Sequence, residues 1–127
     1  MDLWTLLQWV GKILFVALFV FSGLNHLLSL KPMTAYAQSK NVPAASGAVA
    51  VTGLMMLAGA GMILFNWNLA WGAWLLVAFL VPAAFLMHNY WTETDPMMKA
   101  NQMAHFWKNL ALAGAALLMA VGHRGGM

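Results

Sequence analysis

The sequence predicts an all-α integral membrane protein, a bundle of four spanning helices with both termini on the same face of the membrane. Of its 127 residues, 63% are hydrophobic and only 7% are charged, whereas an ordinary soluble domain has about 25% charged residues. A soluble fold of this length could not bury so much apolar surface. The composition therefore excludes a soluble globular protein and a disordered chain.

The gaps between charged residues count the helices. Uncharged stretches of 18, 52 and 15 residues follow Lys12, Lys40 and Lys108. Because a spanning helix needs about 20 mainly apolar residues, the first stretch holds one span and the second holds two, which part at the polar residues of 66–68. The last span must begin before Lys108. We therefore expect one domain, 1–127, with helices at about 10–30, 44–65, 69–87 and 96–122.

The residues at the ends of these segments agree with this count. Pro32 and Pro43 bracket the first loop, where we expect a short interfacial helix. Pro82 falls inside the third span and should kink it. Asp95 is suited to cap the last helix, with Pro96 as its first residue, because an aspartate oxygen accepts from the free amides there and proline has no amide to satisfy.

The loops define two membrane faces. We call face A the side with both termini and the 66–68 turn, and face B the side with the 31–43 and 88–104 loops. Tyrosine and tryptophan residues fall near both faces, as expected at membrane interfaces. The positive-inside rule favours a cytoplasmic face B. Face A carries Lys12 and Arg124, and face B carries Lys31, Lys40, Lys99 and Lys108.

Polar side chains collect at the face-B ends of three predicted helices. Strongly polar groups in membrane helices are costly and often mark functional sites. At about 100° per residue, Gln102, His105 and Asn109 share one stripe with three alanines, 113, 116 and 120, and this stripe should face the bundle. The fourth histidine, His123, lies toward face A. The predicted pocket near face B consists of Asn25, His26, His88, Asn89, Trp91, Gln102, His105, Lys108 and Asn109.

These residue types favour a quinone ligand. A quinone needs hydrogen-bond donors at its carbonyls and a group that exchanges protons near neutral pH. A b-type haem between His26 and either His88 or His105 is the less favoured alternative. We expect no metal site, because three histidines would lack the usual carboxylate ligand unless Glu93 or Asp95 folds inward. The simpler interpretation is that each histidine only bonds a neighbour and that Lys108 extends toward face B.

Other classes of function are excluded by composition. The sequence has no cysteine, so it cannot carry Cys-ligated metals, thiol redox chemistry or covalent c-type haem. A net charge of +3 is too sparse for a nucleic-acid surface. The lipid bilayer is therefore the expected partner, together with a second protein or further copies of this chain.

Four segments resemble the DoxX family of small four-helix bacterial membrane proteins. They are FSGLNHLL (21–28), AYAQSKNVP (35–43), HNYW with DP (88–96) and QMAHFWKNLALAGAALL (102–118). The resemblance implies a bundle in the bacterial cytoplasmic (inner) membrane, associated with quinol oxidase or thiosulfate:quinone oxidoreductase assemblies. The family-like positions are Ser22, Gly23, Asn25, His26, His88, Trp91, Gln102, Phe106, Lys108 and Asn109.

Two hypotheses of function follow. In the first, the protein is a quinone-associated redox membrane subunit with a polar pocket at the end of the bundle. In the second, it is a non-catalytic scaffold or partner subunit of a larger complex, assembled through small-residue helix faces. The second hypothesis is favoured by the lack of a complete catalytic constellation in the sequence, and whether the protein is an enzyme stays open at this point.

Overall fold

The computed structural model describes residues 1–124, and their side chains as far as Gly122. This part of the chain is helical, and its elements in order are α1 (Leu3–Leu28), α2 (Leu30–Ser39), α3 (Ala45–Leu64), α4 (Leu69–Met87), the 3-10 turn η1 (Tyr90–Thr92) and α5 (Pro96–Arg124). Four helices, α1, α3, α4 and α5, are long and apolar enough to cross a membrane. The predicted four-helix membrane bundle is confirmed.

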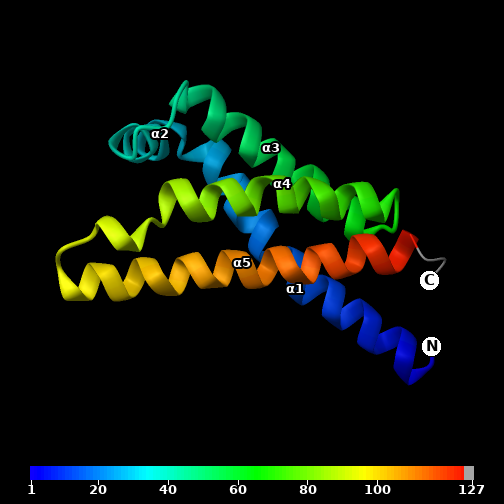
Figure 1. Cartoon of the computed structure of the whole chain (residues 1–127). Coiled ribbons are helices and arrows are strands. Elements are labelled where there is room, and N and C mark those ends of the chain that lie inside the picture. Colours follow the sequence, from blue (N-terminus) through cyan, green and yellow to red (C-terminus); the bar gives the residue numbers. More distant parts are fainter. Residues whose placement is uncertain (125–127) are drawn as a thin grey trace.

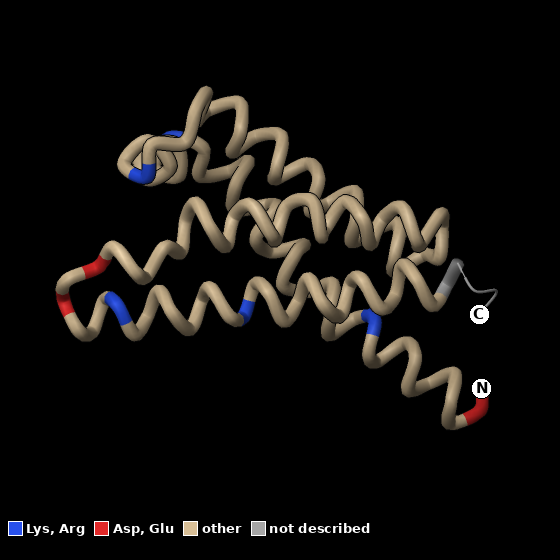
Figure 2. Tube along the Cα trace, in the orientation of Figure 1, with Lys and Arg blue, Asp and Glu red and all other residues tan. Residues whose placement is uncertain are grey.

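The ends of the bundle correspond to the two predicted faces (Figure 1). α1 begins, α3 turns into α4, and α5 ends at one end of the bundle, which is face A. α2 and the α4–α5 connection lie at the other end, face B. Most charged positions are at face B, on α2, in the α4–α5 connection and on the first half of α5 (Figure 2). Face B is therefore the polar end of the molecule.

Side-chain caps set the starts of the first and last helices. Asp2 accepts a hydrogen bond from the backbone N–H of Thr5 at 2.8 Å, so α1 begins at Leu3 rather than near residue 10, and Lys12 lies inside the helix. A lysine does not end a helix, because its long side chain can carry the charge toward water. At α5, Asp95 accepts from the backbone N–H of Met98 at 3.0 Å, as predicted.

Two prolines lie within helices of the bundle, Pro32 in α2 and Pro82 in α4. The loop after the first span contains the helix α2, and Pro32 lies in its first turn, where a missing amide N–H costs no hydrogen bond. α4 continues as a single helix through Pro82. Four residues in the connections between helices have positive φ angles, between 49° and 60°. Asn41 and Ala44 lie between α2 and α3, and Asn66 and Asn68 lie between α3 and α4.

Glycines let neighbouring helices approach closely. α1 packs against α3, α3 against α4, and α4 against α5. A Cβ atom built on Gly23 would lie 2.9 Å from the backbone oxygen of Gly53 on α3, and one built on Gly59 would lie 2.9 Å from that of Gly72 on α4. Apolar burial alone gives helices in lipid no reason to associate, so such close backbone packing supplies the contact energy.

The core fills the space between these crossings. Its fully buried large side chains are Phe19, Met56, Ile63, Leu76 and Leu80, and the α5 side is covered by Ala113, Ala116 and Ala120. The alanine part of the predicted α5 stripe therefore does face the bundle. The first half of α1 diverges from α5 (Figure 1) and leaves its apolar side chains exposed for lipid.

Candidate functional site

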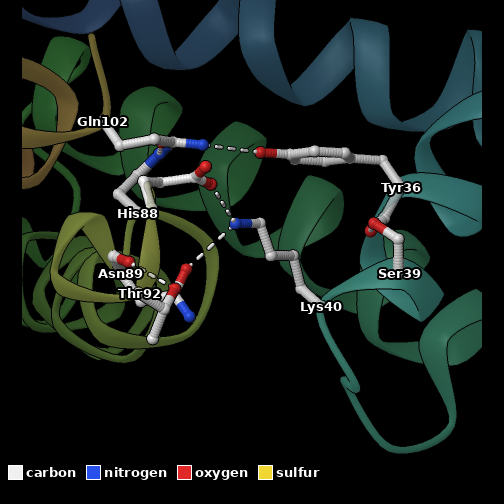
Figure 3. A network of polar contacts seen from close by, with 8 residues as sticks. Tyr36, Ser39, Lys40, His88, Asn89, Thr92 and Gln102 are labelled. Atoms are coloured by element: carbon white, nitrogen blue, oxygen red, sulfur yellow. Dashed lines mark hydrogen bonds and ion pairs between the residues drawn. The ribbon is translucent and has the colours of Figure 1, made fainter. Parts of the chain in front are cut away.

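A chain of hydrogen bonds at face B joins three helices that are distant in sequence (Figure 3). His88, at the end of α4, donates from Nδ1 to Oε1 of Gln102 on α5 at 2.7 Å. Gln102 in turn donates from Nε2 to the hydroxyl of Tyr36 on α2 at 3.1 Å. Because the Tyr36 oxygen accepts this bond, its own hydroxyl hydrogen stays available to another acceptor.

A second polar contact holds α2 beside the α4–α5 connection. The ammonium of Lys40 donates to Oδ1 of Asn89 at 2.9 Å and lies 3.6 Å from a carboxylate oxygen of Glu93. Figure 3 shows Lys40 reaching across from α2 between the Tyr36 hydroxyl and Asn89. α2 is thus tied to this part of the bundle by polar side chains.

His105 on α5 lies against His88 at the end of α4. The rings of His88 and His105 stack with centroids 5.1 Å apart and an interplanar angle of 25°, and Nζ of Lys108 is 3.4 Å from Nδ1 of His105. His105 is nevertheless exposed, although its stripe was expected to point into the bundle. The buried position is taken by Phe106, which is 5% exposed and packs edge-on against Phe85.

The polar residues of α1 point in different directions. Nδ1 of His26 bonds the backbone oxygen of Ser22 at 2.8 Å, and its ring lies edge-on to Phe79, with centroids 6.0 Å apart. Asn25 is exposed and contacts Ser29 and Met33. One turn of α1 therefore directs His26 toward α4 and Asn25 toward α2.

A cleft of about 210 Å³ lies within the bundle near face B. Its polar lining comes from α1, α2, α4 and α5, and its apolar walls include Phe19, Met56 and Phe79. Asn109 is 6% exposed, the one buried polar side chain of the described core, and the side-chain hydrogen bonds of the described residues include none to it. The polar residues lining the cleft are Ser22, His26, Tyr36, His88, Lys108 and Asn109.

Two further cavities adjoin this cleft. A groove of about 260 Å³ runs between α2, α3 and α4 and is lined almost entirely by apolar side chains such as Val49 and Leu86. A vestibule of about 270 Å³, lined by Gln102 and His105 among others, lies toward the start of α5. Tyr36 lines all three cavities, and His88 lines both the cleft and the vestibule.

The structure separates the predicted site residues into three groups. The cleft contains His26, His88, Lys108 and Asn109, and the vestibule contains Gln102 and His105. The remaining three, Asn25, Asn89 and Trp91, line neither cavity. Asn25 contacts Ser29 and Met33 on the α2 side of α1, Asn89 bonds Lys40, and Trp91 packs against the ring of Phe106.

Tyr36 is the principal site residue that the pocket prediction missed. It was grouped with the aromatic residues of the membrane interface. The sequence of 30–40 carries a signal for Tyr36, because Met33, Tyr36, Ala37 and Lys40 follow the three- and four-residue spacing of one face of an amphipathic helix. All four contact other parts of the bundle at face B.

The same geometry bears on metals and haem. Within residues whose side chains are described, no group of three or more His, Asp or Glu side chains is placed to hold a metal ion. Both haem pairings that the sequence offered use His26, whose Nδ1 bonds the backbone oxygen of Ser22, so its Nε2 is the nitrogen left for an iron. The cleft also offers hydrogen-bond donors beside apolar walls.

Together, the fold and the site define a multi-pass membrane bundle with a cleft that contains polar side chains at one end, beside an apolar groove. The chain matches the DoxX family model over residues 7–89. It belongs to the DoxX family. The matched range runs from within α1 to just past α4 and includes His26, Tyr36 and His88, whereas Lys108 and Asn109 lie beyond it.

A relative of the chain is an inner membrane protein. The chain is 27% identical over 112 residues to the inner membrane protein YphA of Escherichia coli K12, an alignment that covers 88% of this chain and 79% of that protein. No solved structure matches the chain. With its four apolar spans, the chain is a multi-pass protein of the bacterial inner membrane.

Proposed function

We propose that this DoxX-family protein is a quinone-associated redox subunit that holds a quinone or quinol head group in the cleft near face B. The observation that supports the proposal is that a cleft with several polar side chains lies beside an apolar groove, with His26, Tyr36 and Phe79 in the lining of both. A quinone has the same two parts, a flat ring with two oxygens and an apolar tail. The ring would occupy the cleft and the tail the groove.

The sizes of the cavities support this division. Ligand pockets typically have volumes of about 300–1,000 Å³. The cleft of about 210 Å³ and the groove of about 260 Å³ each fall below that range, so a ligand of ordinary size would occupy both. An amphipathic molecule that fills both is therefore a better fit than a small polar one that fills the cleft alone.

Each polar side chain of the cleft has a distinct role in this proposal. The buried amide of Asn109 and the ammonium of Lys108 donate hydrogen bonds to quinone oxygens. The Tyr36 hydroxyl oxygen already accepts a hydrogen bond from Gln102, so the hydroxyl hydrogen can be donated to a quinone oxygen. Phe79 and His26 form a wall against the flat face of the ring.

Proton exchange would take place through the wall that separates the cleft from the vestibule. Reduction of a quinone to a quinol consumes two electrons and two protons. His88 and Tyr36 line both cavities, so each can exchange a proton with water on one side and with the ligand on the other. The side chains supply protons and hydrogen bonds, and the electrons would pass to or from a partner redox protein.

The test is binding of a short-chain ubiquinone or menaquinone analogue to the purified protein, measured by quenching of its seven tryptophans. Replacing Asn109 by Leu removes one donor of about 1–1.5 kcal/mol, so the Kd should rise about ten-fold. Lys99→Met on the exposed first turn of α5 is the matched control and should leave the Kd unchanged. Equal Kd values for wild type and Asn109→Leu would overturn the proposal.

A non-catalytic scaffold is the second candidate, and one observation favours it. Several polar groups at face B already bond each other, as in the His88–Gln102–Tyr36 chain and the Lys40 contacts. Holding α2 on the bundle is a sufficient role for such a network, without any ligand. In that case, the purified protein would carry no quinone, and the analogue would not quench its fluorescence.

A further inference from the structure

A second cleft lies at face A, at the opposite end of the molecule from the proposed quinone site. Where the first half of α1 diverges from the bundle (Figure 1), it leaves a cleft of about 480 Å³ between α1, the start of α4 and the last turns of α5. Its polar lining consists of Gln8, Lys12 and Asn66, and its apolar walls include Leu7, Phe15 and Leu69. The cleft is therefore a polar pocket with an apolar floor.

The ammonium of Lys12 has no acidic partner within the described part of the chain. The carboxylate of Asp2 accepts from the N–H of Thr5, and Glu93 and Asp95 belong to the face-B connection. The ring of Trp9, 5.7 Å from the Lys12 ammonium, is a weak substitute, because an aromatic face attracts a cation without neutralising it. The cleft thus contains a half-buried positive charge that an anion would complement.

The aromatic side chains around the cleft indicate its depth in the membrane. Trp9 lies one turn before Lys12, and Trp67 and Trp71 flank the start of α4. All three are exposed, and exposed tryptophans on spanning helices concentrate at the level of the lipid head groups. Lys12 therefore lies close to the level at which phospholipid phosphates are found.

We infer that this cleft is a binding site for the phosphate of an anionic phospholipid. The phosphate would lie on the Lys12 ammonium, with the amides of Gln8 and Asn66 as further donors. The acyl chains would lie along the apolar wall formed by Leu7 and Phe15, which fills the wedge between α1 and the bundle. Basic pockets between membrane helices bind lipid head groups in this manner.

The inference does not depend on the proposed quinone function, because the two clefts share no residue. A zwitterionic phospholipid also has a phosphate, but its own ammonium offsets the attraction to Lys12. The site should therefore prefer phosphatidylglycerol to phosphatidylcholine with the same acyl chains. A preference of about five-fold corresponds to the roughly 1 kcal/mol that one lysine contributes near an anionic surface.

The experiment is native mass spectrometry of the full chain released from detergent, titrated separately with the two lipids. Wild type should bind one phosphatidylglycerol about five-fold more tightly than phosphatidylcholine. Lys12→Gln should abolish this preference, and Lys12→Arg should retain it. The matched control is Lys99→Gln, which removes one positive charge from an exposed helical position at face B and should leave the preference intact.

Three results would overturn the inference. The first is equal binding of both lipids by wild type, and the second is an unchanged preference in Lys12→Gln. The third is a wild-type mass that corresponds to a lipid-free dimer, which would assign the cleft to a second copy of the chain. Circular dichroism of each variant, compared with wild type, shows whether a lost preference reflects unfolding.

Discussion

The close crossing of α3 and α4 makes a quantitative prediction about stability. Gly59 on α3 faces Gly72 on α4, and a methyl group at Gly59 would lie 2.9 Å from the Gly72 backbone oxygen and 2.8 Å from Cδ2 of Leu76. Leu76 can change its rotamer, but a backbone oxygen cannot move without moving its helix. Gly59→Ala should therefore push α3 and α4 apart.

The magnitude follows from a comparison with a second glycine on the same helix. A Cβ atom at Gly61 meets nothing within 4 Å. Glycine-to-alanine replacement within a helix gains about 1 kcal/mol of intrinsic propensity at either position. Because this gain is common to both variants, their difference isolates the cost of overpacking, which is typically about 1–3 kcal/mol. Gly59→Ala should be less stable than Gly61→Ala by that amount.

The assay is reversible unfolding of the purified protein in mixed micelles as the SDS fraction rises, followed by helical circular dichroism. The transition of Gly61→Ala should occur at the same SDS fraction as wild type or at a higher one. The transition of Gly59→Ala should occur at a lower SDS fraction than that of Gly61→Ala. If the two variants unfold at the same SDS fraction, the helices do not approach as closely as the structure shows.

Two further predictions concern the ends of the molecule. Lys40→Met removes the contacts to Asn89 and Glu93, so backbone amides of α2 should exchange with deuterium faster while those of α3 do not; unchanged exchange in α2 would show that these contacts do not hold it. At α1, the hydrogen bond from the Thr5 amide lowers the pKa of Asp2 below its ordinary value, so the cap is complete above the ordinary pKa and is lost as the pH falls through the lowered one. The protection factors of the first-turn amides of α1, which are exchange rates corrected for the intrinsic effect of pH, should therefore fall on acidification in wild type. Asp2→Asn should abolish that dependence; a persistent dependence in Asp2→Asn would assign it to another group.

The parts of the fold that the sequence predicted correctly depend on short-range chemistry. The cap at Asp95 needs only an amide three residues away, and the span count needs only uninterrupted apolar stretches. The start of α1 was missed because Lys12 was taken as a boundary, although a lysine near the interface can remain in a helix. Local patterns therefore locate helices better than they locate helix ends.

The site was harder to predict, because helical phase gives direction only relative to the same helix. Asn109 and His105 share one stripe of α5, yet Asn109 is buried and His105 is exposed. The rotation of α5 is fixed by Phe106, which packs against Phe85 of α4. Such a contact between two helices cannot be read from the periodicity of either one.

The sequence by itself determined that four helices cross the membrane, that both termini lie on one face and that polar side chains collect at the other. Each of these follows from hydropathy along the chain, because transfer to lipid depends on composition over about 20 residues. The tertiary structure alone decided that Tyr36 meets Gln102, 66 residues away, and that the cleft lies beside an apolar groove. These depend on how α2 folds back over the bundle, which is set by packing and hydrogen bonds between segments that are distant in the sequence.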